Sequence, residues 1–293
     1  MKVTLLQRDI VWASPKENAQ ANEKIIARHC GCEAEEEGES GKGGEGKCNS
    51  CGTELFVLPE MFSTGFATSP DGIAEPIGED GKCFTLRWME EMARKYNCAI
   101  TGSVAVQEGY VSDAKQGAVP TEPKFYNRLY FVTPHGYLQY DKHHLFTYGG
   151  EHKRYSPGKE RVIAEWKGVK FLLQICYDVR FPVFSRNRLM PNIPYCPEYD
   201  AIIYVASWPE TRVATWKKLL PARAIENQSY VLAVNRVGTD PACSYIGGTM
   251  VIDPLGNIAA QVSDGKEDAI TTELDMAYLA KARSKFPVLE DAD

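Results

Sequence analysis

Short apolar runs bounded by turn residues recur along nearly the whole chain. They lie at residues 3–9, 55–58, 98–106, 125–133, 137–141, 161–166, 169–175, 200–206, 229–237, 246–253 and 257–263. Runs of this length with Gly, Pro, Asn or Asp at their ends are typical of β-strands. Those with almost no polar residue, such as 200–206, are expected to be buried on both faces.

Segments with helical periodicity lie between some of these runs. A helix is predicted from Ser14 towards His29, because Ser14 and Pro15 suit the first positions of a helix. At 86–96, apolar residues recur every three or four positions and charged residues lie between them, which predicts an amphipathic helix. Two further helices are predicted, at 211–225 and 276–284. This alternation indicates the α/β class, and the lack of a linker favours one domain over residues 1–293.

Composition and charge exclude several classes of protein. The net charge of −6 gives no general attraction to nucleic acid, whose binding domains usually carry a basic surface. No apolar run reaches the 18 residues of a membrane span, and the N-terminal segment becomes polar too early for a signal peptide. Nine cysteines, an odd number, argue against a disulfide framework. We therefore expect a cytoplasmic protein without a nucleic-acid or membrane partner.

An insertion at residues 30–51 interrupts the alternating pattern. It is rich in Gly and Glu, holds no large apolar residue, and is expected to be exposed. Its cysteines, Cys30, Cys32, Cys48 and Cys51, could bind a structural zinc ion. Reduced thiols in a solvated loop are the favoured alternative, because the Cys30-x-Cys32 spacing is tighter than that of usual zinc knuckles.

Three strand ends carry residues of complementary chemistry. Glu60 follows the run at 55–58, Lys142 follows 137–141, and Cys176 follows 169–175. A thiol attacks an amide only if a base takes its proton and a positive group stabilises the resulting oxyanion, and these three residues supply those groups. His143 and His144 allow a papain-like Cys–His dyad as an alternative, but neither lies in a protease-like signature.

The segments around these residues closely resemble the signatures of the carbon–nitrogen hydrolase (nitrilase) superfamily. The signatures occur in the family's order, as Leu58-Pro59-Glu60, Asp141-Lys142-x-His144-Leu145-Phe146, and Ile175-Cys176-Tyr177-Asp178-Val179-Arg180-Phe181-Pro182. The resemblance covers nearly the whole chain. It implies a four-layer α-β-β-α sandwich, a homodimer, a small-molecule amide substrate and no cofactor.

The resemblance also implies a role for each matching residue. Cys176 is the expected nucleophile, Glu60 the general base, and Lys142 the group that stabilises the oxyanion. The backbone N–H of Tyr177 is expected to complete the oxyanion hole. Glu151 matches a second glutamate with which family members position the lysine and the substrate.

Three further segments, 176–187, 222–228 and 285–287, resemble the omega-amidase subgroup. This implies hydrolysis of the terminal amide of 2-oxoglutaramate or 2-oxosuccinamate, through a cysteine thioester, to the dicarboxylate and ammonia. Within the family, the alternatives are another amidase, a carbamoyl-amide hydrolase and a nitrilase. The alternative from a different class is a non-catalytic binding protein with a zinc knuckle at 30–51.

Four residues are candidates for the substrate pocket because each follows a strand end or lies near a signature. They are Phe66, Tyr148, Arg180 and Trp208. Arg180 could hold a substrate carboxylate, and a structural ion pair is its alternative role. The three aromatic residues could equally belong to the core.

Overall fold

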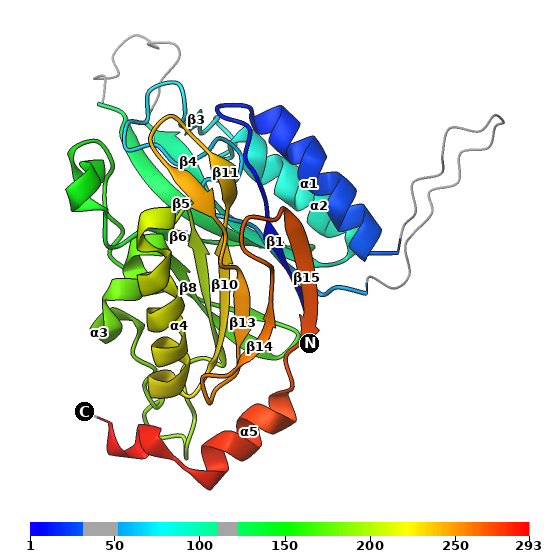
Figure 1. Ribbon diagram of the computed structural model, residues 1–293, viewed down its shortest axis with the longest axis vertical. Helices are drawn as coiled ribbons and strands as arrows, with labels where there is room; N and C mark the ends of the chain where they lie inside the picture. Colours follow the sequence, from blue (N-terminus) through cyan, green and yellow to red (C-terminus); the bar gives the residue numbers. More distant parts are fainter. Residues whose placement is uncertain (32–51, 110–121, 293) are drawn as a thin grey trace, which may run out of the picture.

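Two β-sheets lie face to face in the computed structural model, which describes residues 1–31, 52–109 and 122–292. Helices α1 (Pro15–His29) and α2 (Phe84–Tyr96) cover the outer face of the first sheet, and α4 (Val213–Asn227) covers the outer face of the second (Figure 1). The order of layers is therefore helix, sheet, sheet, helix. Helix α5 (Met276–Lys285) lies at the end of the molecule that carries the C-terminus (Figure 1).

The first sheet has the strand order β15-β1-β2-β4-β5-β6, with β3 paired to β4. Strands β1, β2 and β4 run parallel to one another. Strand β15 pairs antiparallel with β1, β5 pairs antiparallel with β4, and β6 pairs antiparallel with β5. The strands are β1 (Lys2–Gln7), β2 (Leu55–Val57), β3 (Glu75–Pro76), β4 (Ala99–Glu108), β5 (Lys124–Thr133), β6 (Gly136–Asp141) and β15 (Asp268–Glu273).

The second sheet has the strand order β14-β13-β10-β9-β8-β7, in which β8, β9 and β10 are parallel. Its strands are β7 (Ile163–Trp166), β8 (Val169–Ile175), β9 (Ala201–Ala206), β10 (Tyr230–Asn235), β13 (Met250–Ile252) and β14 (Ile258–Gln261). A separate hairpin joins β11 (Val237–Thr239) and β12 (Ser244–Ile246). The short helix α3 (Pro182–Ser185) follows the loop after β8.

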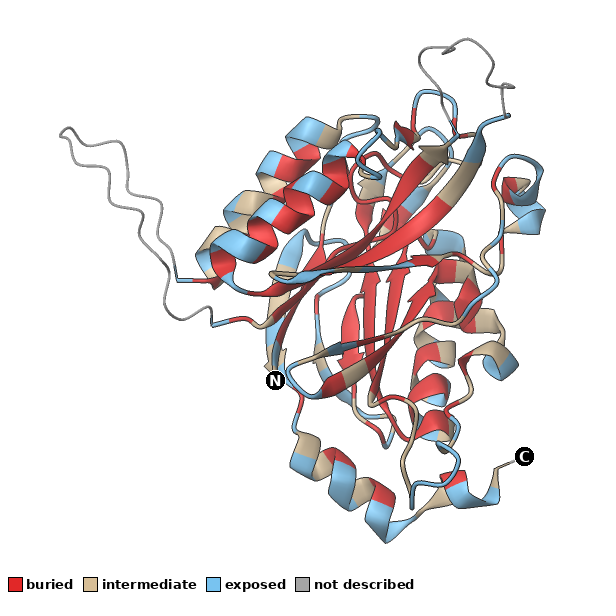
Figure 2. Ribbon diagram, turned by 180° about the vertical axis from the view of Figure 1, so that it is seen from behind, coloured by how far each residue is buried: buried red, intermediate tan, exposed pale blue. Residues whose placement is uncertain are grey.

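The parallel strands are buried on both faces, which explains their nearly continuous apolar sequences. In β2, Leu55 and Val57 point into the core between the sheets, whereas Phe56 points towards α1 and α2. Alternation of side chains along a strand sends neighbours to opposite faces, and here both faces are covered. Figure 2 shows the same arrangement, with buried strands at the centre and exposed residues on the outer sides of the helices.

The structure departs from the sequence-based elements mainly near the C-terminus. Strand β15 was not predicted, because Asp268–Glu273 is polar and largely exposed and has no apolar run. The predicted helix at 211–225 begins at Val213, after a single 3-10 turn (Glu210–Arg212).

Most of the insertion at 30–51 lies outside the described residues.

Gly102 in β4 permits a close approach between this strand and the segment that follows β2. A Cβ atom at Gly102 would lie 2.7 Å from Cδ1 of Phe62 and 2.9 Å from Cβ of Leu58. We predict that Gly102→Ala lowers the free energy of unfolding by about 1–3 kcal/mol, because a packed core has no room for the added methyl group. Urea denaturation measures this change.

Gly52→Ala is the matched control. A Cβ atom added at Gly52 would have its nearest neighbour 3.4 Å away, an ordinary contact distance, so this change should leave the free energy of unfolding nearly unchanged. An equal stability for wild type and Gly102→Ala would show that the segment after β2 can move away from β4 at little cost.

Candidate active site

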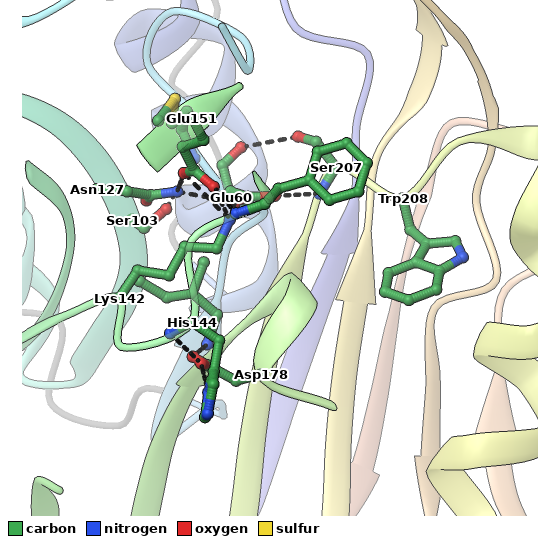
Figure 3. A network of polar contacts seen from close by, with 12 residues as sticks. Glu60, Ser103, Asn127, Lys142, His144, Glu151, Asp178, Ser207 and Trp208 are labelled. Carbon is green, nitrogen blue, oxygen red and sulfur yellow. Dashed lines mark hydrogen bonds and ion pairs between the residues drawn. The ribbon is translucent and has the colours of Figure 1, made fainter. Parts of the chain in front are cut away.

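The three predicted strand-end residues meet at the seam between the two sheets. Glu60 and Lys142 come from the first sheet, after β2 and β6, and Cys176 comes from the second sheet, directly after β8. The Nζ atom of Lys142 lies 3.0 Å from Oε1 of Glu60, and the thiol of Cys176 lies close enough to both residues for their charges to act on its pKa. Each sheet thus supplies part of one site (Figure 3).

The Glu60 carboxylate is fully buried and held on both oxygens. Oε1 accepts hydrogen bonds from Nζ of Lys142 and, at 2.8 Å, from Nδ2 of Asn127. Oε2 accepts one from the backbone N–H of Ser207 at 2.8 Å. These donors come from different strands and both sheets, so they fix the position of the carboxylate.

Glu151 holds the other side of the lysine. Its carboxylate lies 3.0 and 3.2 Å from Nζ of Lys142 and also accepts a hydrogen bond from the backbone N–H of Phe146 at 2.6 Å. The Asn127 amide, 3.4 Å from Glu151, spans both glutamates. Gly150, with φ +84°, makes the turn that directs Glu151 inward.

One buried ammonium therefore faces two buried carboxylates. Burial lowers the pKa of Lys142, but the negative charges of Glu151 and Glu60 outweigh it and hold that pKa well above its ordinary value. The lysine therefore stays charged across the physiological pH range.

The pKa of Cys176 depends on burial and on the charges beside the thiol. A lysine beside a thiol lowers the thiol pKa, and the charge of Lys142 acts in that direction. Burial and the negative charge of Glu60 are stronger, however, and the pKa of Cys176 lies well above its ordinary value. The resting thiol is neutral and needs a base to become a nucleophile.

Two residues of the site adopt a strained backbone conformation. Cys176 has φ +46°, and Met61, next to Glu60, has φ +44°. Residues other than glycine seldom occupy this left-handed region, and at functional sites the surrounding structure holds them there. Cys176 begins the 3-10 helix Cys176–Arg180, so the chain turns sharply at the thiol.

Asp178 joins the loop that carries the lysine to the loop that carries the thiol. Its Oδ2 accepts hydrogen bonds from the Tyr140 hydroxyl at 2.7 Å and the Ile175 N–H at 2.9 Å. Its Oδ1 accepts from the backbone N–H and from Nδ1 of His144, at 3.0 and 2.8 Å (Figure 3). The His144 ring also stacks on Phe181, 3.8 Å between centres. His144 thus aligns two loops and does not contact the thiol.

A pocket opens above Cys176. Three of the four predicted pocket residues, Phe66, Arg180 and Trp208, line it. The full lining is Phe66, Lys142, Phe146, Cys176, Tyr177, Arg180, Ser207, Trp208, Pro209, Arg212, Cys243 and Tyr245.

The prediction that Tyr148 lines the pocket is wrong. Its side chain is 88% exposed and is not among the lining residues. Tyr148 lies in the 3-10 turn Thr147–Gly149, which carries it outward, and Phe146 lines the pocket in its place.

Sequence reasoning did not identify Asn127, Ser207 or Arg212. Asn127 could have been identified, because it places a side-chain amide inside the apolar run at 125–133. A buried polar group needs hydrogen-bond partners, so its presence there indicates a polar site. Ser207 follows a buried strand end, as Glu60 and Cys176 do. Nothing in the sequence indicated that Arg212 lines the pocket, since an arginine before a helix is usually exposed to solvent.

The possible zinc site at Cys30, Cys32, Cys48 and Cys51 lies mostly outside the described residues. Cys30 is buried at the C-terminal end of α1, whereas Cys32, Cys48 and Cys51 lie outside the described residues. Within residues 1–31, 52–109 and 122–292, no group of three or more His, Cys, Asp or Glu side chains is arranged to hold a metal ion. In those same ranges, no helix has the length and apolar character to cross a membrane.

Comparison with known proteins identifies the family. A sequence model of carbon–nitrogen hydrolases matches residues 2–284. The chain belongs to the carbon–nitrogen hydrolase family. The superfamily predicted from the three signatures is therefore confirmed.

Relatives of this carbon–nitrogen hydrolase match it over its whole length. An omega-amidase of Escherichia coli is 39% identical, covering 100% of this chain and 97% of the relative. A 2-oxoglutaramate amidase of Bacillus subtilis is 32% identical, covering 99% and 96%. A crystal structure of a superfamily protein from Xanthomonas campestris, with an arsenic adduct in its active site, is 36% identical, with a TM-score of 0.82 over 100% of this chain and 97% of that one. The predicted sandwich fold is thus confirmed.

We predict that Glu60→Gln lowers the pKa of Cys176, because it removes a negative charge that raises this pKa and leaves the positive charge of Lys142. The midpoint of iodoacetamide labelling against pH should move down by about one unit or more, the size expected for loss of an adjacent like charge. Peptide mapping by mass spectrometry follows Cys176 separately from the other thiols.

Glu165→Gln, an exposed change on β7, is the control and should leave the profile unchanged. A midpoint that moves upward in Glu60→Gln would contradict the electrostatic account of the thiol.

Proposed function

We propose that this protein is an omega-amidase, which hydrolyses the terminal amide of a small 2-oxo acid amide such as 2-oxoglutaramate or 2-oxosuccinamate. The products are the dicarboxylate and ammonia. One observation carries the proposal: a buried cysteine, lysine and glutamate meet at the base of a pocket whose charged lining residues are all cationic. The names of two full-length relatives, an omega-amidase and a 2-oxoglutaramate amidase, support the same assignment.

In the first step, the sulfur of Cys176 attacks the carbonyl carbon of the amide. Glu60, whose carboxylate lies beside the thiol, accepts its proton as the carbon–sulfur bond forms. The raised pKa of the thiol means that little thiolate exists beforehand, so proton transfer belongs to the attack itself.

The tetrahedral intermediate carries a negative charge on the former carbonyl oxygen. The Lys142 ammonium and the backbone N–H of Tyr177, the residue after the nucleophile, are the donors proposed to stabilise it. Glu151 acts as a positioning residue, because its carboxylate fixes Nζ of Lys142 from the side opposite Glu60. A donor held in advance loses little energy to reorganisation during the reaction.

Collapse of the intermediate breaks the carbon–nitrogen bond. Glu60 returns its proton to the departing nitrogen, ammonia leaves, and a thioester remains on Cys176. Water then attacks the thioester carbon and gives a proton to Glu60. That proton returns to the sulfur as the carboxylic acid is released, which restores the starting state.

Arg180 is the proposed partner of the substrate carboxylate. Among the described residues it has no salt bridge, so its alternative role as a structural ion pair lacks a partner. Its guanidinium lies 4.9 Å from the centre of the Trp208 ring, and both residues line the pocket. A guanidinium held by an aromatic ring keeps its N–H donors available for a carboxylate.

A homodimer and a cytoplasmic location are also proposed. Exposed apolar side chains on the outer layer of the second sheet, Val183 on α3 and Ile225 on α4, support association through this face. The odd number of cysteines supports a reducing compartment. Light scattering on the purified protein would test the dimer.

We predict that Cys176→Ala lowers ammonia release from 2-oxoglutaramate by on the order of 10⁴-fold or more, because the thioester can no longer form. Circular dichroism should be unchanged. Ammonia release above background in Cys176→Ala would rule out the proposed nucleophile, and Cys196→Ser, a partly exposed thiol elsewhere, should stay active.

A substrate panel separates the other interpretations. Preferential release of carbon dioxide from a carbamoyl amide, or turnover of a nitrile, would assign another branch of the family. No turnover of any amide or nitrile by a folded wild-type protein would support a non-catalytic binding role.

A further inference from the structure

We propose that Arg212 is a specificity residue that acts with Arg180 to admit 2-oxo acid amides and to reject the corresponding amino-acid amides. This inference rests on the proposed function and deepens it. It explains how the site would distinguish 2-oxoglutaramate from glutamine, which ends in the same carboxamide and differs only in having an ammonium in place of the 2-oxo group.

Arg212 is anchored beside the pocket. It is the last residue of the 3-10 turn Glu210–Arg212, directly before α4, and its backbone carbonyl accepts a hydrogen bond from Nε1 of Trp208 at 2.8 Å. Its guanidinium lies 5.3 Å from the centre of the Phe146 ring, and Arg212, Phe146 and Trp208 all line the pocket. Arg212 and Arg180 therefore share one cavity, and each packs against an aromatic ring of its wall.

Neither of these arginines has a salt bridge within residues 1–31, 52–109 and 122–292. Other arginines packed close to the core of the second sheet are neutralised: Arg223 pairs with Glu226 at 2.8 Å, and Arg283 pairs with Asp200 at 2.9 Å. A cation without an internal partner that faces a cavity is suited to bind an anionic ligand. The two guanidinium groups of the pocket fit that description.

No carboxylate appears among the pocket-lining residues, so neither guanidinium faces an acidic side chain across the pocket. The acids that contact pocket-lining residues have other partners. Glu60 and Glu151 hold Lys142, and Asp240 accepts a hydrogen bond from the Tyr245 hydroxyl at 2.6 Å. The site thus offers no acidic partner for a substrate ammonium.

A 2-oxo acid amide and an amino-acid amide therefore differ in how well they match this pocket. The 2-oxo acid end presents a carboxylate and an adjacent carbonyl oxygen, which are all acceptors and match the donors of two guanidinium groups. An amino-acid end presents an ammonium beside the carboxylate. Two uncompensated guanidinium groups repel that charge, and its three N–H donors find no acidic acceptor in the pocket.

Steady-state kinetics on Arg212→Gln with 2-oxoglutaramate, glutamine and pentanamide test this inference. We expect kcat/KM for 2-oxoglutaramate to fall on the order of 10- to 100-fold, the size of one or two charge-assisted hydrogen bonds, mainly through KM. The ratio of kcat/KM for 2-oxoglutaramate to kcat/KM for glutamine should fall by a similar factor. The loss on pentanamide, which has neither carboxylate nor ammonium, should be at least tenfold smaller.

Two further variants sharpen the result. Arg212→Lys keeps the charge without the planar fork and should show an intermediate loss. Arg94→Gln removes an exposed arginine on α2 and should behave as wild type. The rate of Cys176 labelling by iodoacetamide should be the same in Arg212→Gln and wild type, which checks that the nucleophile remains in place.

The outcomes separate the two levels of the proposal. If wild type hydrolyses 2-oxoglutaramate and Arg212→Gln keeps the same preference over glutamine, the role of Arg212 is refuted and the omega-amidase function stands. Equal losses on all three amides would also refute it, since they indicate a structural role. If wild type hydrolyses pentanamide or glutamine but no 2-oxo acid amide, the proposed function itself fails.

Discussion

The buried ammonium of Lys142, held between the carboxylates of Glu60 and Glu151, is the interaction on which the site depends. A single positive charge cannot balance two buried negative charges, so neutral donors must supply the rest. The Asn127 amide and the backbone N–H groups of Ser207 and Phe146 do so. Burial and the negative charge of Glu60 raise the pKa of the neighbouring thiol, which keeps its proton until a carbonyl carbon is available to attack.

This arrangement ties the chemistry to the packing of the two sheets. Glu60 and Lys142 belong to one sheet, Cys176 and Ser207 to the other, and the apolar core between the sheets sets their separation. The strained backbone at Met61 and Cys176 persists because both residues are buried and their neighbours hold them in place. Changes that loosen the contact between the sheets should therefore weaken the site before they unfold the protein.

Much of this could be predicted from the sequence, for identifiable reasons. Strands buried on both faces produce apolar runs, and the three signatures fixed Glu60, Lys142 and Cys176 by residue number. Strand β15 has no apolar run, because it lies at the edge of its sheet and its side chains are exposed or half-buried. Tyr148 was wrongly assigned to the pocket, because the 3-10 turn Thr147–Gly149 carries it outward and leaves Phe146 to line the pocket. The sequence does not show in which direction this turn points each ring. The thiol pKa depends on burial and distance, neither of which is visible in the sequence.

The most direct test of this account is a titration of the Cys176 thiol in the wild-type protein, read as ultraviolet thiolate absorbance with Cys176→Ala subtracted. The account predicts no ionisation step between about pH 6 and 9, because the ordinary thiol pKa near 8.5 is raised by burial and by Glu60. A step near neutral pH would contradict it, since Lys142 would then dominate and Glu60 would not be needed as the base.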